Sequence, residues 1–119
     1  MEGVVQVCGT VGAFAAIKAN GSVVTWGDAA FGGNSSAIAP LLSEGVDQVC
    51  ANNGAFAAIK ANGSVVTWGD ADWGGNSSVV AQLLTEGVVH VYGNNGAFAA
   101  IKANGSVVTW GSAAFGGNS

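Results

Sequence analysis

The sequence predicts an all-β fold made of three tandem repeats, and three observations lead to that prediction. The 16-residue string GAFAAIKANGSVVTWG begins at Gly12, Gly54 and Gly96 without a change, so the repeat period is 42 residues. Short apolar runs alternate with Asn-Gly and Gly-Gly pairs, as in strands joined by tight turns. In residues 55–60 both alternating faces are mostly small and apolar, which indicates a sheet covered on both sides.

The whole chain, residues 1–119, is predicted to be a single repeat domain. The N-terminal MEGVVQVCGTV aligns with the residues that precede the repeated string in the other two copies. Residues 12–53 and 54–95 are identical at 32 of 42 positions, which indicates recent amplification or deliberate design. The units are residues 1–35, 43–77 and 85–119, and the connectors are residues 36–42 and 78–84.

The elements of the middle unit follow in a clear order. We expect a strand over residues 46–50, a turn at 52–54 and a second strand over 55–60. A third strand is expected over residues 65–68, and a Gly-rich loop over 70–76. The middle unit is therefore predicted to form three short strands and a loop.

Two local signals join these elements. Asn-Gly between apolar runs is a strong hairpin signal, and it predicts a type I′ turn in which both residues have positive φ. Ser77 and Ser78 are suited to cap a short helical turn that runs through Leu84. The predicted hairpin turns contain Asn20, Gly21, Asn62, Gly63, Asn104 and Gly105.

The string IKANGSVVTWGDAAFGG, preceded by GVVQVCGT, resembles the repeats of the regulator of chromosome condensation family. Its distinctive features are the glycine of the hairpin, the Trp-Gly pair and the following aromatic-Gly pair. The resemblance covers nearly the whole chain and implies one β-propeller blade per repeat. The founding member is a nucleotide exchange factor for a small GTPase and docks on chromatin. Its contact loops are not recognisable here, so the resemblance implies the fold and not the activity.

The repeated aromatic residues and glycines are expected to pack between blades. A tryptophan followed by glycine recurs in every unit, and this periodicity favours a structural role over stacking on a ligand. The predicted structural core of the repeat consists of Trp26, Trp68, Trp110, Gly27, Gly69, Gly111, Phe14, Phe56 and Phe98.

Three blades are too few to close a ring, because propellers have about four to eight. An open arc exposes strand edges and apolar faces to solvent. We therefore expect the chain to bind a second copy of itself, so that a twofold homodimer completes a ring of six blades. The alternative all-β fold is a β-trefoil, whose three repeats close within one chain.

Composition limits the partners of this chain. Its net charge is −4, so it offers no basic patch for nucleic acid. It has no apolar run of membrane-spanning length and no signal-peptide pattern, so we expect a soluble, intracellular protein without a membrane partner. Cys8 and Cys50 are interpreted as small strand hydrophobes. The threefold set Lys18, Lys60 and Lys102 is expected to keep strand edges soluble rather than to bind an anion.

Few residues point to chemistry. Asp70, Asp72 and Asn76 share one Gly-rich loop, and oxygen ligands at this spacing are the one candidate for a calcium site. The equivalent loops lack some of these oxygens, so we expect a solvated turn and no metal or other cofactor. His90 is the one histidine, and no nucleophile, base and acid form a recognisable motif around it.

The sequence therefore favours a non-enzymatic, self-assembling β-propeller scaffold or interaction module over an enzyme. Partner binding is expected at positions that differ between repeats, namely 30–31, 37–40 and 47–51. The alternative function is a carbohydrate-binding, lectin-like protein with one site per repeat. The near-identity of the units also fits a designed or reconstructed repeat protein.

Overall fold

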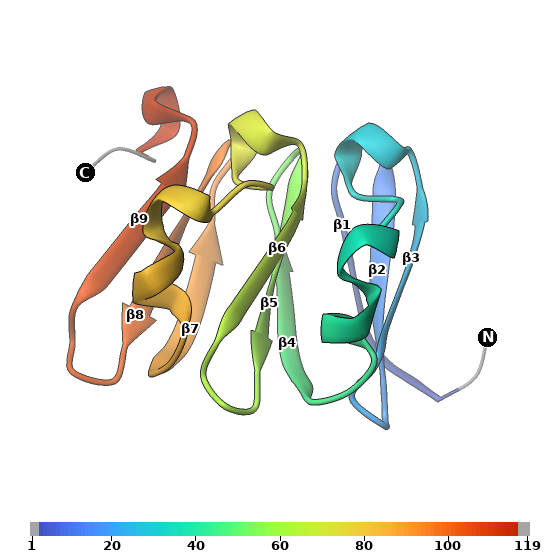
Figure 1. Cartoon of the computed structure of the whole chain (residues 1–119). Coiled ribbons are helices and arrows are strands. Elements are labelled where there is room, and N and C mark those ends of the chain that lie inside the picture. Colours follow the sequence, from blue (N-terminus) through green and yellow to red (C-terminus); the bar gives the residue numbers. More distant parts are fainter. Residues whose placement is uncertain (1–2, 117–119) are drawn as a thin grey trace.

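The computed structural model of this chain describes residues 3–116, which form three antiparallel sheets of three strands each. The sheets stand side by side in sequence order (Figure 1). In each sheet the second strand lies in the middle and pairs with the first and the third. The strands are β1 Val4–Gly9, β2 Ala13–Lys18, β3 Val23–Gly27, β4 Val46–Ala51, β5 Ala55–Lys60, β6 Val65–Gly69, β7 Val88–Gly93, β8 Ala97–Lys102 and β9 Val107–Gly111.

Short 3-10 helices lie between the strands. Three of them follow the last strand of a sheet, and the two longer ones, η2 and η4, lie in front of the strands in Figure 1. None of the helices between residues 3 and 116 is long and apolar enough to cross a membrane. The helices are η1 Ala29–Phe31, η2 Ser36–Leu42, η3 Ala71–Trp73, η4 Ser78–Leu84 and η5 Ala113–Phe115.

The strands lie where the sequence predicts them. β5 covers the predicted residues 55–60, while β4 and β6 extend the predicted strands by one residue each, to Ala51 and Gly69. The prediction of an all-β fold with one sheet per repeat is confirmed. The β-trefoil alternative is wrong, because the repeats form three separate sheets that stand side by side as blades.

The hairpins contain Asn-Gly as predicted, but the turn is not of type I′. Within residues 3–116 only glycines have positive φ, so Asn20 does not. The N–H of Gly21, whose φ is 82°, donates to the carbonyl of Lys18 at 2.9 Å, which makes a three-residue loop that ends in a left-handed glycine. The Asn20 side-chain oxygen accepts from the backbone N–H and the hydroxyl of Ser22. This local bonding holds the asparagine in the turn without a positive φ.

The helical turn predicted after Ser77 is present as η4, but its cap is different. Ser77 makes no side-chain capping hydrogen bond. Instead the side-chain oxygen of Asn76 accepts from the N–H of Ser78 at 2.9 Å. The prediction of a serine cap is wrong, because the side chain of Asn76 accepts the hydrogen bond from the free N–H of Ser78.

Neighbouring sheets pack face to face through two apolar clusters, one at each junction. The cluster between the first two sheets includes Leu42 and Phe56, and the cluster between the last two includes their counterparts Leu84 and Phe98. Three alanines of β5 and Phe56 are completely buried, so the middle sheet is covered on both faces. Small side chains let the sheets approach closely enough to fill the space between them.

The first strand of each sheet is an edge strand and carries a β-bulge where it pairs with the second strand. Its register against the second strand shifts between Val4 and Gln6 in β1, which leaves Val5 without a partner across the ladder. Asp47 and Val89 hold the same position in β4 and β7. β1 contacts β4 and β4 contacts β7, and we call these three strands the inner rim.

Gly63 and Gly105 provide a matched test of how closely the blades pack. Both have positive φ, 83° and 86°, so alanine costs roughly 1–2 kcal/mol of backbone strain at either position. A Cβ on Gly63 would lie 2.7 Å from the backbone nitrogen of Gly87, whereas no atom of the described residues lies within 4 Å of one on Gly105. In dilute protein, we expect Gly63→Ala to lower the free energy of unfolding by about 1 kcal/mol more than Gly105→Ala. Urea denaturation measures both losses, and equal losses would contradict this packing.

Candidate interface at the blade faces

Each junction between two neighbouring blades contains a Phe–Trp pair, which belongs to the blade that comes later in the chain. Phe56 and Trp68 face each other across β5 and β6, with ring centroids 5.3 Å apart. A Cβ on Gly32 would lie 2.5 Å from the Phe56 ring, so this ring rests on the bare backbone of the preceding blade. The indole N–H of Trp68 donates to the carbonyl of Gly32 at 3.2 Å. The junction therefore requires glycine at position 32.

The second junction repeats this contact. The rings of Phe98 and Trp110 are 5.5 Å apart, and the indole N–H donates to the carbonyl of Gly74 at 3.1 Å. Backbone bonds accompany the aromatic contact, because the N–H of Val88 donates to the carbonyl of Gly63 at 3.0 Å. One set of contacts therefore joins both pairs of neighbouring blades.

The first blade presents the same aromatic face without a neighbour. Its exposed fractions are 36% for Val4, 53% for Val7, 48% for Phe14 and 40% for Trp26. Their counterparts in the second and third blades are exposed by 7% or less. We call these four residues the leading face.

The third blade presents the opposite face of a junction. Among residues 3–116, nothing lies within 4 Å of a Cβ placed on Gly105 or Gly116, although a Cβ on their counterparts in the other blades would contact the next blade. Tyr92 and Val107 are each 59% exposed on the same blade. We call these four residues the trailing face. The leading face is therefore equivalent to the surface that the second and third blades bury against the preceding blade. The trailing face is equivalent to the surface that the first and second blades bury against the following blade.

The predicted core residues lie together in each blade. The Phe14–Trp26 pair of the first blade has ring centroids 5.6 Å apart, close to the values in the other two. The glycine after each tryptophan has a φ of 110–113°, and a Cβ there would lie 2.7 Å from the Cα of the first residue of the middle strand. These glycines are Gly27, Gly69 and Gly111. In each Trp-Gly pair the tryptophan ring therefore belongs to the contact surface between blades, while the glycine lets the third strand approach the backbone of the middle strand inside the blade.

The candidate calcium loop uses its oxygens for local structure. The Asp70 carboxylate accepts from the N–H of Asp72 at 3.0 Å and caps η3, while the Asn76 oxygen caps η4. In the described part of the chain, no group of three or more His, Cys, Asp and Glu side chains is placed to hold a metal. His90 is exposed, and its ring contacts that of Tyr92, with centroids 5.9 Å apart.

Sequence reasoning missed the residues that receive the aromatic pair. Gly32 and Gly74 stand in the aromatic-Gly pairs that carry the family resemblance, but their contacts reach a blade that begins many residues later. A buried cap at Asn52 was also missed. Its side-chain oxygen accepts from the N–H groups of Gly54 and Ala55, and its amide donates to the carbonyl of Trp73. The Asn-Asn-Gly sequence predicts a turn but not this bond to the following loop.

The arrangement of blades is shared with known structures over 91% of the chain. Human WBSCR16 aligns with a TM-score of 0.63 and 19% sequence identity. The fold is that of an RCC1-like β-propeller. Prp20p from Saccharomyces cerevisiae aligns with a TM-score of 0.69 and 19% identity, and yeast RCC1 (Prp20) in its complex with Kap60 aligns with 0.65 and 17%. The propeller-like fold expected from the sequence resemblance is thereby confirmed.

The chain corresponds to a part of each of these propellers. The aligned region covers 34% of WBSCR16, 30% of Prp20p and 29% of the yeast protein in the Kap60 complex. No protein-family model and no curated protein sequence matches the chain. The comparisons therefore show an RCC1-like partial propeller.

The indole hydrogen bond can be tested with a matched pair of variants. Trp68→Phe removes the donor to the Gly32 carbonyl inside a buried junction, and we expect it to lower the free energy of unfolding by about 1–3 kcal/mol. Among residues 3–116 the indole N–H of Trp26 has no acceptor, so Trp26→Phe should change stability by less than about 1 kcal/mol in dilute protein. Thermal unfolding of both variants checks this, and similar losses would count against the role of the Gly32 contact.

The two cysteines are held in their neutral form. Burial raises the pKa of the Cys8 thiol to about 11. Burial and, secondarily, the nearby Cys8 raise the pKa of Cys50 to about 12. The Cys8 thiol donates across the first junction to the carbonyl of Val49 at 3.7 Å. Both side chains therefore behave as small neutral groups at neutral pH, as the sequence predicts.

These raised pKa values predict slow alkylation and a loss of stability in alkali. Thiols of the unfolded chain ionise near pH 8.5. The stabilisation of the neutral thiols is therefore complete below about pH 8.5 and is lost as the pH rises toward 11. We expect iodoacetamide to modify the native protein at pH 8 far more slowly than the urea-unfolded chain. The double variant Cys8→Ala, Cys50→Ala should lose less stability between pH 8.5 and 11, and an equal loss would refute the linkage.

Proposed function

We propose that this chain is a non-enzymatic β-propeller module that assembles with a second copy of itself. One observation carries the proposal. The four leading-face side chains are 36–53% exposed, whereas the same side chains are 7% exposed or less at both internal junctions. Because the units are nearly identical, the surfaces that would meet between two copies largely repeat the surfaces that meet inside one. The internal junction is therefore the template for the interface between copies.

The internal contacts specify what a second copy would supply. The indole N–H of Trp26 would donate to the carbonyl of Gly116 in the second copy, as happens at both internal junctions. Phe14 would rest on the backbone of the same glycine. The N–H of Val4 would donate to the carbonyl of Gly105, as the equivalent groups do inside the chain. Closure would thus add an aromatic contact and hydrogen bonds, in addition to covering apolar surface.

Two copies are the simplest closed assembly. With a twofold axis, the leading face of each copy covers the trailing face of the other, and the two arcs give six blades, within the usual range of about four to eight. The trailing face of the third blade differs from the equivalent faces of the other two where Tyr92 takes the place of Cys8 and Cys50, and Tyr92 is 59% exposed. Tyrosine is enriched at protein interfaces, which supports contact between copies at this position.

An interaction role also fits the chemistry of the exposed residues. Two side chains of the candidate calcium loop, Asp70 and Asn76, cap helices, and His90 contacts Tyr92. The leading face consists of apolar side chains, and the trailing face combines exposed glycine backbone with Tyr92 and Val107. Such surfaces suit packing against another blade and not acid–base chemistry.

The proposal predicts the mass of the protein in solution. Gel filtration with light scattering at micromolar concentration should give a dominant species of twice the 11.6 kDa of one chain. A dominant monomer at these concentrations would overturn the proposal. A closed trimer would keep the self-association and refute the count of six blades.

Glycine variants on the trailing face test the mode of closure. Gly116→Ala adds a methyl group at a position where a Cβ on either counterpart, Gly32 or Gly74, would lie 2.5–2.6 Å from a phenylalanine ring of the next blade. We therefore expect dimer affinity to fall at least about tenfold. Gly45→Ala is the matched control, because Gly45 also has positive φ, 74°, but its Cβ would contact one lysine carbon at 3.6 Å. Loss of affinity in the control alone, or in neither variant, would contradict closure through this face.

A further inference from the structure

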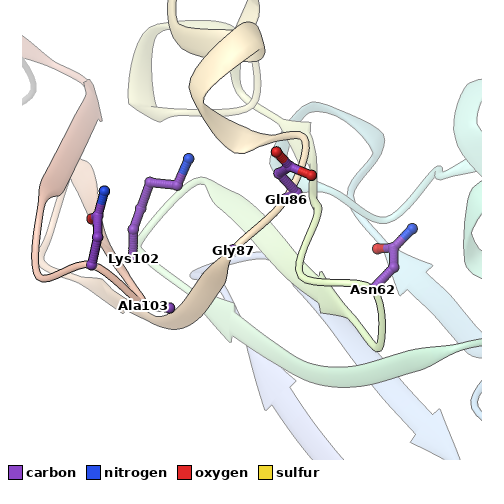
Figure 2. A pocket seen from close by; sticks show the side chains of 6 residues that line it. Asn62, Glu86, Gly87, Lys102 and Ala103 are labelled. Atoms are coloured by element: carbon purple, nitrogen blue, oxygen red, sulfur yellow. The ribbon is translucent and has the colours of Figure 1, made fainter.

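Equivalent clefts recur at the hairpin end of the blade junctions. Each complete cleft combines asparagines from two successive hairpins, the Glu-Gly pair before the first strand of a sheet, and the Lys-Ala pair at the end of its middle strand. The cleft in Figure 2 has a volume of about 430 Å³, and a second cleft of about 430 Å³ lies one repeat earlier. The cleft in Figure 2 is lined by Asn62, Glu86, Gly87, Lys102, Ala103 and Asn104.

Polar groups in this cleft are free to bind a ligand. The Asn62 side-chain oxygen accepts from the backbone N–H and hydroxyl of Ser64, which holds the side chain and leaves its amide N–H groups available. Within residues 3–116 the Glu86 carboxylate and the Lys102 ammonium have no hydrogen-bond or ion-pair partner. Figure 2 shows these three side chains on three different segments around the opening. Donors and an acceptor therefore surround one space.

The charges in the cleft select the class of ligand. A phosphate or other anion would be held by Lys102 but repelled by the carboxylate of Glu86, and a metal ion would meet the opposite conflict. A neutral ligand with several hydroxyl groups satisfies all the groups together, because a hydroxyl both donates to a carboxylate and accepts from an amide or ammonium. The volume of about 430 Å³ suits one small ligand.

We infer that each complete cleft is a binding site for a neutral sugar residue. Glu86 accepts hydrogen bonds from sugar hydroxyls, while Asn62 and Lys102 donate to them. Among residues 3–116 two such sites follow, one at each internal junction. In the earlier site the Lys60 ammonium already donates one hydrogen bond to the carbonyl of Leu41 at 2.7 Å, so it has one donor fewer for a sugar than Lys102. This inference does not depend on self-association, because both sites lie within one chain.

A third, partial cleft links the inference to the proposed assembly. It has a volume of about 450 Å³ and is lined by Gly3, Lys18, Ala19 and Asn20, without the asparagine of a preceding hairpin. In the ring, Asn104 of the second copy would supply that side chain. This part of the inference rests on the proposed function and predicts three sites per chain in the dimer.

Nuclear magnetic resonance titration tests the sites directly. Glucose, galactose, mannose and N-acetylglucosamine are added to the full chain at millimolar concentrations, and the backbone amides of Gly45, Ala61, Gly87 and Ala103 are followed. At least one sugar should shift these amides in a saturable way. No saturable shift with any of the four sugars would overturn the inference, and so would shifts with glycine or inorganic phosphate that exceed those with every sugar.

Carboxamide variants separate specific binding from a change in net charge. In the double variant Glu44→Gln, Glu86→Gln the acceptor charge is lost at both complete clefts, so sugar affinity should fall about tenfold. Asp47→Asn is a control with the same kind of charge change on β4, outside the clefts, and should leave affinity unchanged. Equal affinity in the double variant and the wild-type protein would overturn the assignment of these carboxylates.

The same titration distinguishes the two proposals. Shifts at Gly87 and Ala103 in a protein that stays monomeric would keep the sugar sites and reject the ring. A dimer whose amides do not shift would keep the ring and reject the sugar sites. In a sugar-binding dimer, Gly3 and Ala19 should also respond, and Gly116→Ala should weaken that response at low protein concentration while leaving the shifts at the internal clefts.

Discussion

The structure depends on how closely one blade can approach the next. At each junction a phenylalanine ring presses on the backbone of a glycine in the preceding blade, and the paired tryptophan donates a hydrogen bond to that glycine's carbonyl. A side chain on the glycine would separate the sheets, and an alanine in place of the tryptophan would leave a buried carbonyl without a donor. The contact therefore sets the distance between neighbouring blades, and it determines which face of one blade packs against which face of the next.

The unusual composition of the chain follows from that spacing. The middle strand of the central sheet is buried on both faces, so alanine is the residue that fills it without pushing the blades apart. Charged residues make up only 8% of the chain, and the three lysines stand at the ends of the middle strands, where the hairpins open to solvent. A chain built in this way can extend by whole repeats, because every unit carries both halves of the junction.

The sequence was sufficient for elements that depend on neighbours along the chain. The strand over residues 55–60 was predicted to the residue, because its apolar run is bounded by Gly54 and Ala61-Asn62. The turn type was wrong, because the Asn20 side chain bonds to Ser22 and leaves the positive φ to the glycine. The role of Gly32 and the polar clefts were not predictable, since both arise where one blade meets another. Periodicity shows that units repeat, but not which surfaces touch.

The bulge on each strand of the inner rim has a further consequence for how the repeats can change. The same unpaired position is held by valine in β1 and β7 (Val5 and Val89) and by aspartate in β4 (Asp47), so the backbone kink forms with an apolar or a charged residue. A kinked edge is also a poor template for an added strand, which protects the open side of each sheet from fibre-like pairing with other chains. The rim thus combines protection against strand addition with tolerance of different residues at the bulge, while the stacked faces keep the same residues.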